Sequence, residues 1–181
     1  MYSVHLAHAA YIIKQGGIVA YPTESCYGLG CHPRNRQAIR RLISIKKRPQ
    51  HKGLILVAAD FSQLQAYVAD ISPDILATWP GPHTWLLPAT PYVLAEILGR
   101  HPRVAVRITA HAPAAALCRA AGTAIVSTSA NRSGQRPAKT YRETLWRLGE
   151  SVDFVLPGQT GKQSRPSAIV DAVTHDVIRA G

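Results

Sequence analysis

Two stretches of this sequence bring together side chains that can bind phosphate groups. The first is the cationic run Lys46-Lys47-Arg48, which is followed by Pro49 and then by Lys52. Neighbouring ammonium and guanidinium groups can hold phosphate oxygens, and the guanidinium offers paired donors. The same residue types are also common at the C-terminal end of a helix, where they interact with the helix dipole. A phosphate-binding role and a purely structural role are therefore both open for this run.

The second stretch runs from Ser127 to Gly134 and is rich in hydroxyl and amide groups. It contains Ser127, Thr128, Ser129, Asn131 and Ser133. Such side chains, together with backbone N–H groups at the end of a strand, can bind phosphate or ribose. The alternative is an Asn-capped turn, because Ser and Asn also bond readily to their own backbone. The position after an expected buried strand favours the binding role.

A third polar cluster, Thr23-Glu24-Ser25, follows the apolar run Ile18–Tyr21 and Pro22. The apolar run predicts a buried strand, and Pro22 should stop it because proline has no N–H for a ladder hydrogen bond. Gly28 and Gly30 then indicate a turn. Proteins of the α/β class often place ligand contacts at such strand ends, although a turn with an incidental hydroxyl gives the same pattern.

Alternating helical and strand patterns must position these clusters. Apolar spacing predicts helices over residues 4–15, 36–45, 64–68, 93–98, 113–121 and 141–148, with a further helix beginning at Ser72. Asn35 can cap the helix over residues 36–45. Apolar or alternating runs predict strands over residues 18–21, 54–59, 84–88, 103–108, 124–128 and 154–156, with a closing pair at 168–171 and 177–179. This alternation predicts the α/β class, and the closing pair predicts a mixed sheet.

The composition is that of a globular and strongly basic chain. Of its 181 residues 46% are apolar, and 21 Lys and Arg against 10 Asp and Glu give a net charge of +11. The apolar fraction is enough for a core and excludes a disordered chain. The cationic excess favours a polyanionic ligand such as a nucleotide, pyrophosphate or nucleic acid, although a merely soluble cationic surface would also produce it.

Several classes of protein are disfavoured. No apolar run approaches the length of a membrane span, and the N-terminal residues lack the layout of a secretory signal. Three cysteines without paired spacing argue against a disulfide framework, so a cytoplasmic location is expected. The sequence has no glycine-rich phosphate loop, no GxGxxG pattern and no recognisable catalytic triad. Cys26, Cys31 and His32 offer too few ligands for a structural zinc, and no metal site is predicted.

The full set of motifs resembles the YrdC/Sua5 family, and within it the short bacterial form. The resembling segments follow one another over nearly the whole chain: Tyr21–Glu24, Tyr27–Gly30, Lys46–Pro49, Lys52–Ile55, Trp79–Pro82, Thr84, Ala105–Ile108, Val126–Asn131, Ser133–Gly134, Pro166–Ser167, Ile169–Asp171, Arg179 and Gly181. The family's KxR and SxN signatures fall on Lys46, Arg48, Ser129 and Asn131. The resemblance implies one domain over residues 1–181, with a twisted mixed sheet and flanking helices around a concave basic cavity.

The resemblance also implies an activity. Proteins of this form combine L-threonine, bicarbonate and ATP, with Mg²⁺, into threonylcarbamoyl-adenylate and pyrophosphate. Other proteins of the pathway then transfer the threonylcarbamoyl group to adenosine 37 of tRNAs that read ANN codons. Whether the chain itself binds tRNA is left open by the sequence.

By the same resemblance, individual residues take roles in this reaction. Lys46 and Arg48 would neutralise the charge that develops on the phosphates. The nucleotide would be lined by Arg48, Ser127, Ser129, Asn131 and Arg179. Threonine would be held by Thr23, Arg107 and Ser167, with Arg107 on its carboxylate. Longer family members carry a threonine-contacting histidine shortly after the KxR signature, whereas Leu54–Val57 contains none.

An RNA-binding module is the rival interpretation. A protein with a net charge of +11 could use a concave basic surface to contact RNA phosphates, although the sequence shows no RNA-recognition motif. Binding to many phosphates weakens steeply with ionic strength, whereas synthesis from small substrates should be much less sensitive. The two activities do not exclude each other.

Overall fold

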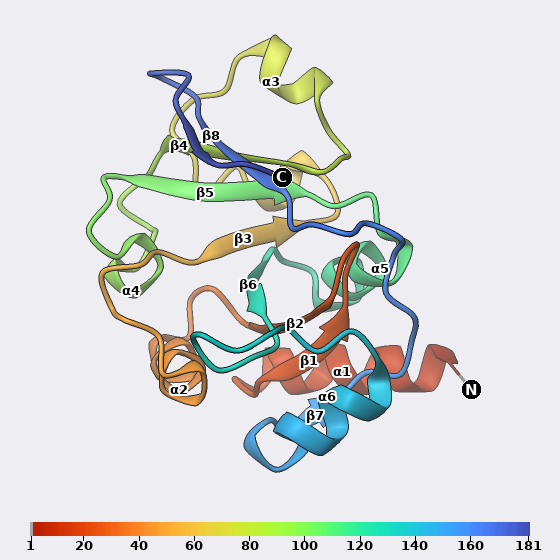
Figure 1. Ribbon diagram of the computed structural model, residues 1–181. Coiled ribbons are helices and arrows are strands. Elements are labelled where there is room, and N and C mark those ends of the chain that lie inside the picture. The colour runs from red at the N-terminus through yellow and green to blue at the C-terminus, as the bar shows by residue number, and fades with distance from the viewer. Residues whose placement is uncertain (1) are drawn as a thin grey trace.

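The computed structural model describes residues 2–181. Its centre is a mixed sheet of nine strands. The strand order is β7-β1-β2-β6-β3-β5-β4-β8-β9 (Figure 1). The strands are β1 (Val19–Pro22), β2 (Tyr27–Cys31), β3 (Ile55–Ala58), β4 (His83–Pro88), β5 (Arg103–Ile108), β6 (Ile125–Ser129), β7 (Phe154–Val155), β8 (Ala168–Asp171) and β9 (Val177–Arg179). Three neighbouring pairs are parallel, namely β1 with β7, β3 with β5 and β4 with β8, which confirms the predicted mixed α/β fold.

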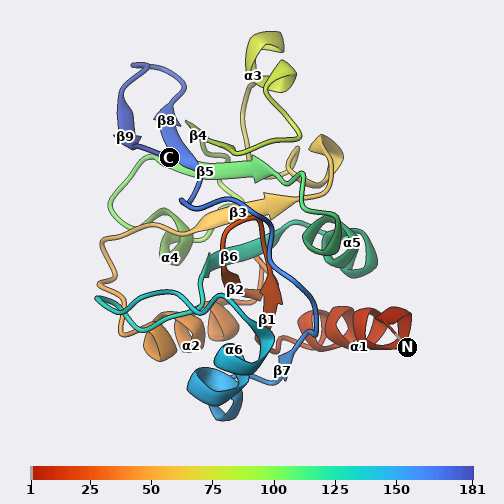
Figure 2. The ribbon, with the colours of Figure 1, turned by 45° about the vertical axis from the view of Figure 1, so that its right-hand side comes forward.

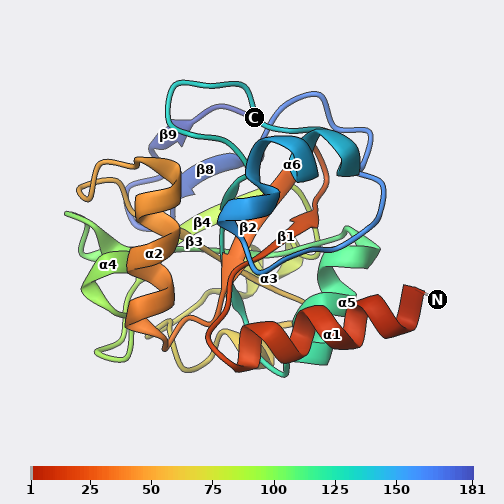
Figure 3. The ribbon, with the colours of Figure 1, turned by 90° about the horizontal axis from the view of Figure 1, so that it is seen from below.

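Helices pack on both faces of this sheet. They are α1 (Tyr2–Lys14), α2 (Arg36–Lys46), α3 (Pro73–Ala77), α4 (Ala95–Leu98), α5 (Ala112–Ala121) and α6 (Tyr141–Leu148), with 3-10 turns η1 (Phe61–Gln63) and η2 (Gly149–Ser151). Seen from below, α1 lies beside α5, and α2 lies beside α4 (Figure 3). The β8–β9 pair and β7 form the two opposite edges of the sheet (Figure 2).

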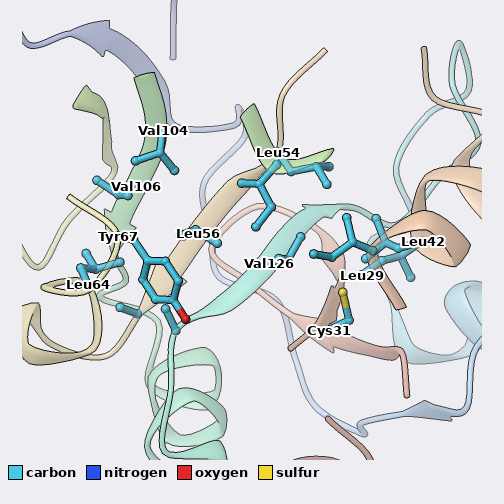
Figure 4. Close-up of a cluster of buried hydrophobic side chains, with 14 of the residues drawn as sticks. Leu29, Cys31, Leu42, Leu54, Leu56, Leu64, Tyr67, Val104, Val106 and Val126 are labelled. Atoms are coloured by element: carbon cyan, nitrogen blue, oxygen red, sulfur yellow. The ribbon is translucent and has the colours of Figure 1, made fainter. Parts of the chain in front are cut away.

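The strands supply alternate side chains to two hydrophobic clusters, as the two-residue period of a strand requires. In β1, Val19 and Tyr21 belong to the cluster under α1 and α5, whereas Ala20 points to the opposite cluster. The larger cluster also receives the apolar face of α2, and Leu29, Leu42 and Val126 are among its labelled members in Figure 4. The helices therefore hold the strand ends, and the polar residues at those ends, in fixed positions.

Helix α2 begins and ends where local chemistry dictates. The Asn35 side-chain oxygen accepts a hydrogen bond from the Ala38 N–H at 2.9 Å, as predicted for the helix cap. Lys47 caps the C-terminal end of the helix and adopts the left-handed conformation with φ of 48°. The helix thus includes Lys46 as its last residue, and the chain turns sharply before Arg48.

Strand β2 differs from the sequence prediction, which placed a turn at Gly28 and Gly30. This segment pairs with β1 on one side and with β6 on the other. A Cβ atom on Gly30 would lie 2.6 Å from Ile125 Cγ2 and 2.8 Å from Tyr21 Cε1, so the glycine is required by close packing inside the sheet. Pro22 also belongs to β1, as its last residue.

The predicted helix over residues 64–68 is also wrong. Residues 61–63 form η1, the chain then makes turns, and Val68 bridges to Ala89. The Gln63 side chain accepts the Ala59 N–H at 2.9 Å and donates to the Cys118 carbonyl at 3.0 Å, so contacts with other elements replace helical hydrogen bonds here. None of the helices within residues 2–181 is long and apolar enough to cross a membrane.

Candidate active site

A cavity of about 460 Å³ lies where the polar strand ends meet. Seven of the nine predicted site residues line it: Thr23, Arg48, Arg107, Ser127, Ser129, Ser167 and Arg179. They come from segments far apart in the sequence, namely the end of β1, the loop after α2, and strands β5, β6, β8 and β9 with their flanks. A cavity of this volume is large enough for a small organic ligand such as a nucleotide.

The cavity wall is strongly cationic. Six Lys and Arg residues line it, and no carboxylate does so among the residues of the described chain: the six are Arg48, Lys52, Arg103, Arg107, Lys139 and Arg179. Burial lowers the pKa of Arg48, and burial together with the nearby charges of Arg107 and Arg48 lowers the pKa of Arg179. Such crowding of like charges favours an anionic ligand with several charges.

Lys46 lies behind the wall and is not part of it. Its side chain is buried, with the residue 2% exposed, and its Nζ donates to the Ser129 carbonyl at 2.5 Å, the Asn131 carbonyl at 2.8 Å and Asn131 Oδ1 at 3.3 Å. All three donors of the ammonium are therefore used inside the protein. Lys46 fixes the turn that follows β6, which carries the second predicted cluster.

Asn131 also lies outside this cavity. Its Oδ1 accepts the Ser129 hydroxyl at 2.5 Å, and its Nδ2 donates to the carbonyls of Arg132 and Gln135, both at 2.8 Å. The side chain is thus engaged in the turn, which corresponds to the alternative left open from the sequence. Asn131 instead borders a second hollow, of about 570 Å³, beside α6.

Arg48 is fastened to the loop that leads into β3. Its Nη2 donates to the Gly53 carbonyl at 2.7 Å, and its Nε donates to the Lys52 carbonyl at 3.2 Å. These bonds hold the guanidinium group against the cavity wall. Arg48 and Lys52 therefore place two cationic side chains on one side of the cavity, as the sequence predicted for the rim of the sheet.

Arg107, Ser167 and Arg179 make two separate sets of polar contacts. Arg107 is buried, and its Nη2 lies 3.2 Å from Glu24 Oε2. The Ser167 hydroxyl lies 2.8 Å from the Thr84 hydroxyl, and Arg179 donates to the Ser167 carbonyl through Nη2 at 2.7 Å and Nε at 3.2 Å. Ser167, which is assigned to threonine, is thus bonded to Arg179, which is assigned to the nucleotide.

Two other basic residues of the wall, Lys139 and Arg103, had no predicted role. Lys139 stands in a segment without regular structure, and Arg103 reads as one position of an alternating strand. No local pattern separates either of them from an ordinary surface cation. Leu54, Ile55 and Val57 line this cavity with apolar side chains, and their segment contains no histidine.

The residues of the cavity do not fit a metal site built from protein ligands. Nowhere in residues 2–181 do three or more His, Cys, Asp or Glu side chains gather in a way that could hold a metal ion. The cavity wall offers hydroxyls and cations but no carboxylate, and carboxylates are the usual protein ligands of Mg²⁺.

The structure is that of an α/β protein with a cationic cavity among the strand ends of a mixed sheet, a site suited to small anionic ligands. A family model described as "Sua5_yciO_yrdC: Telomere recombination" matches residues 11–181. The chain belongs to this Sua5/YciO/YrdC family.

Curated relatives match the chain along nearly all of its length. The threonylcarbamoyl-AMP synthase of Methylobacillus flagellatus is 52% identical over 173 residues, which cover 93% of this chain and 96% of the relative. The protein with the same name from Chromobacterium violaceum is 50% identical over 171 residues, covering 92% of this chain and 88% of the relative.

Solved structures share the fold. Escherichia coli YciO is 27% identical with a TM-score of 0.86, and the match covers 100% of this chain and 90% of YciO. Pyrococcus abyssi Sua5 complexed with L-threonine is 32% identical with a TM-score of 0.86, covering 92% of this chain and 50% of that Sua5. The chain therefore spans about half the length of the Sua5 protein.

Proposed function

We propose that this protein is a nucleotidyltransferase that makes threonylcarbamoyl-AMP and pyrophosphate from L-threonine, bicarbonate and ATP. The observation that carries the proposal is the match, along nearly the whole chain, to relatives named threonylcarbamoyl-AMP synthase. The cationic cavity supports it, because ATP and pyrophosphate are the polyanions that such a wall would attract. The product would serve the t6A modification of tRNA.

The reaction consists of two bond-forming steps. The threonine amine combines with bicarbonate to give N-carboxythreonine and water. A carboxylate oxygen of that group then attacks the α-phosphorus of ATP, and the bond to the β-phosphate breaks as pyrophosphate leaves. No covalent bond to the protein is needed, so positioning and charge stabilisation supply the catalysis.

We assign the substrates to two neighbouring groups of residues in the cavity. Arg48 and Arg179 would bind the phosphates, with the hydroxyls of Ser127 and Ser129 beside them. Lys46 would add positive charge from behind the wall and hold the turn of Asn131 in place. Threonine would lie near Thr23, Arg107 and Ser167, with its carboxylate on Arg107.

Mg²⁺ is proposed only as the ion that ATP carries with it. The wall lacks carboxylates, so the phosphate oxygens and water would supply the ligands of the ion. When bound, Mg²⁺ would neutralise part of the triphosphate charge. The basic side chains of the wall, with Lys46 behind it, would supply the contribution of this chain to charge neutralisation.

The remaining partners are proposed from the same function. Proteins of the t6A pathway in the cytoplasm would accept the threonylcarbamoyl group, and tRNA is a further candidate partner. The net charge of +11 favours a second candidate function, an RNA-binding module, because it exceeds what the six wall residues supply.

Pyrophosphate release by the purified protein tests the proposal. We expect release that requires ATP, threonine and bicarbonate together, with omission of any one reducing it to background. Mass spectrometry should detect one threonylcarbamoyl-AMP for each pyrophosphate released. Release that ignores threonine and bicarbonate, or no release by folded protein, would contradict the synthase function and favour the RNA-binding module.

A further inference from the structure

Two buried polar side chains lie just behind the cavity wall, at the C-terminal end of β1. Tyr21 is 0% exposed and Glu24 is 6% exposed, and neither lines the cavity. Thr23, which stands between them in the sequence, does line it. The short segment Tyr21–Glu24 therefore contributes one residue to the wall and two residues to a layer that supports the wall.

Tyr21 supports the nucleotide side. Its hydroxyl donates a hydrogen bond of 2.7 Å to the Ser127 hydroxyl, 106 residues away in the sequence. Burial raises the pKa of Tyr21 well above its usual range, so the phenol keeps its proton and is able to donate this bond. Because Ser127 Oγ accepts this bond, its own proton is directed away from Tyr21 and is available to a ligand in the cavity.

Glu24 supports Arg107, the wall residue assigned to the threonine carboxylate. Its Oε1 accepts the Thr109 hydroxyl at 2.6 Å, and its Oε2 lies 3.2 Å from Arg107 Nη2. Oε2 receives no hydrogen bond, and Arg107 Nε is buried without a partner. The carboxylate therefore holds the guanidinium by charge, while donors of Arg107 stay uncommitted to any protein group.

The backbone of Glu24 is itself held in place. Its carbonyl accepts the Gln163 N–H at 3.1 Å, and the Thr23 carbonyl accepts the Gly161 N–H at 2.9 Å. A Cβ atom on Gly161 would lie 2.5 Å from the Glu24 carbonyl oxygen, so this close approach requires glycine. Glu24 is thus fixed from two directions, which lets it define the position of Arg107.

We propose that Tyr21 and Glu24 are positioning residues with separate targets. Tyr21 orients Ser127 toward the nucleotide, and Glu24 orients Arg107 toward the threonine carboxylate. This inference rests on the proposed function for the identity of the two ligands. It predicts that the two residues affect different substrates, although they are only three positions apart in the sequence.

The test compares Tyr21→Phe with Glu24→Gln, each of which keeps the size of its side chain. Loss of the hydrogen bond in Tyr21→Phe should raise the KM for ATP about fivefold and leave the KM for threonine unchanged. Glu24→Gln should raise the KM for threonine about tenfold and leave the KM for ATP unchanged. Tyr92→Phe and Glu150→Gln are matched controls at exposed positions and should behave as the wild type.

A third variant addresses Glu24 without removing its charge. Thr109→Val deletes the hydroxyl that bonds to Glu24 Oε1, and we expect a smaller rise, about threefold, in the KM for threonine alone. A parallel rise of both KM values in every variant would overturn the inference, because it would indicate general loosening of the fold.

Calorimetric binding of ATP and of L-threonine separates this inference from the proposed function. If the wild type binds both ligands but releases no pyrophosphate, the proposed function fails, and the positioning roles are still decided by the binding data. They stand if Tyr21→Phe weakens only ATP binding and Glu24→Gln weakens only threonine binding. They fall if each variant weakens both ligands, or neither.

Discussion

At the scale of single residues, Lys46 carries a positive charge in a buried place. The three oxygens that accept its hydrogen bonds belong to two carbonyls and one amide, and none is a carboxylate. Burial and the nearby charge of Arg48 lower the pKa of Lys46 to about 8. The charge of this residue should therefore change within the pH range in which enzymes are routinely assayed.

We predict that affinity for ATP falls as the pH rises through about 8, where the Lys46 ammonium loses its proton. The neutral amine holds the turn after β6 less strongly and contributes no charge, so the dissociation constant should rise about fivefold. Calorimetry with ATP alone, from about pH 7 to about pH 9.5, avoids titration of the threonine amine. Lys46→Met should bind weakly at every pH, and a wild-type affinity that stays constant would contradict this role.

Deprotonation of Lys46 is expected to weaken ATP binding but to raise the free energy of unfolding. The pKa of Lys46 is lower in the folded protein than its ordinary value of 10.5, so the unfolded chain binds the proton more strongly. Its contribution to the free energy of unfolding therefore rises as the pH increases from about 8 to 10.5, by up to about 1.4 kcal/mol per pH unit. The protonated form of Lys46 thus favours ATP binding, whereas the neutral form favours the folded state.

At the scale of elements, the β1–β2 hairpin carries the supporting layer of the cavity. Tyr21 packs over Gly30, and a Cβ atom there would lie 2.8 Å from the Tyr21 ring and 2.6 Å from Ile125. The ring position is thus set by the absence of a side chain on the neighbouring strand.

We predict that Gly30→Ala lowers the free energy of unfolding by about 2 kcal/mol, because the added methyl group overpacks the sheet. It should also weaken ATP binding, because the displaced Tyr21 no longer reaches Ser127. Thermal unfolding and calorimetry measure the two effects. Gly149→Ala is the control, since a Cβ there meets only the Leu145 side chain. Normal ATP affinity in Gly30→Ala would contradict the role of the β1–β2 hairpin in positioning the nucleotide-binding residues.

Sequence patterns predicted elements best where one local signal dominated. The Asn35 cap and the apolar face of α2 were sufficient to predict that helix almost to the residue. Strand β2 was missed because Gly28 and Gly30 resemble a turn, and only contact with Tyr21 and Ile125 explains Gly30. The helix predicted over residues 64–68 failed because Gln63 bonds to other elements.

The residues of the site were likewise predictable where a local pattern marked them, and not where contacts with distant segments decide their position. Residues such as Thr23 and Ser127 stand at the ends of apolar strands, so their place on the cavity wall could be predicted. The burial of Lys46 could not, because its acceptors lie 83 and 85 residues away. The pairing of Glu24 with Arg107 is equally invisible in the sequence, since each residue alone resembles an ordinary charged position.

At the scale of the whole molecule, the net charge of +11 acts on every anion that approaches. An RNA that contacts six or more phosphate-binding cations should lose about a thousandfold in affinity between about 50 mM and 200 mM salt. We predict that kcat/KM for ATP in pyrophosphate synthesis falls less than about tenfold over the same range, because ATP carries only a few charges. Steady-state assays and filter binding with tRNA at matched salt concentrations provide the comparison. A fall in synthesis as steep as that of tRNA binding would contradict a reaction confined to small substrates.

The order of the strands has a consequence for how the chain acquires its structure. The interior strand β6 lies between β2 and β3 in the sheet, yet it comes from residues 125–129. Strands β1 and β4 pair with β7 and β8, which come still later in the chain. A ribosome must therefore release most of the chain before the sheet can close, and contacts between such distant segments make folding slow. Until then the first half of the protein exposes unpaired strand edges, and we expect the incomplete chain to be most prone to aggregation at this stage.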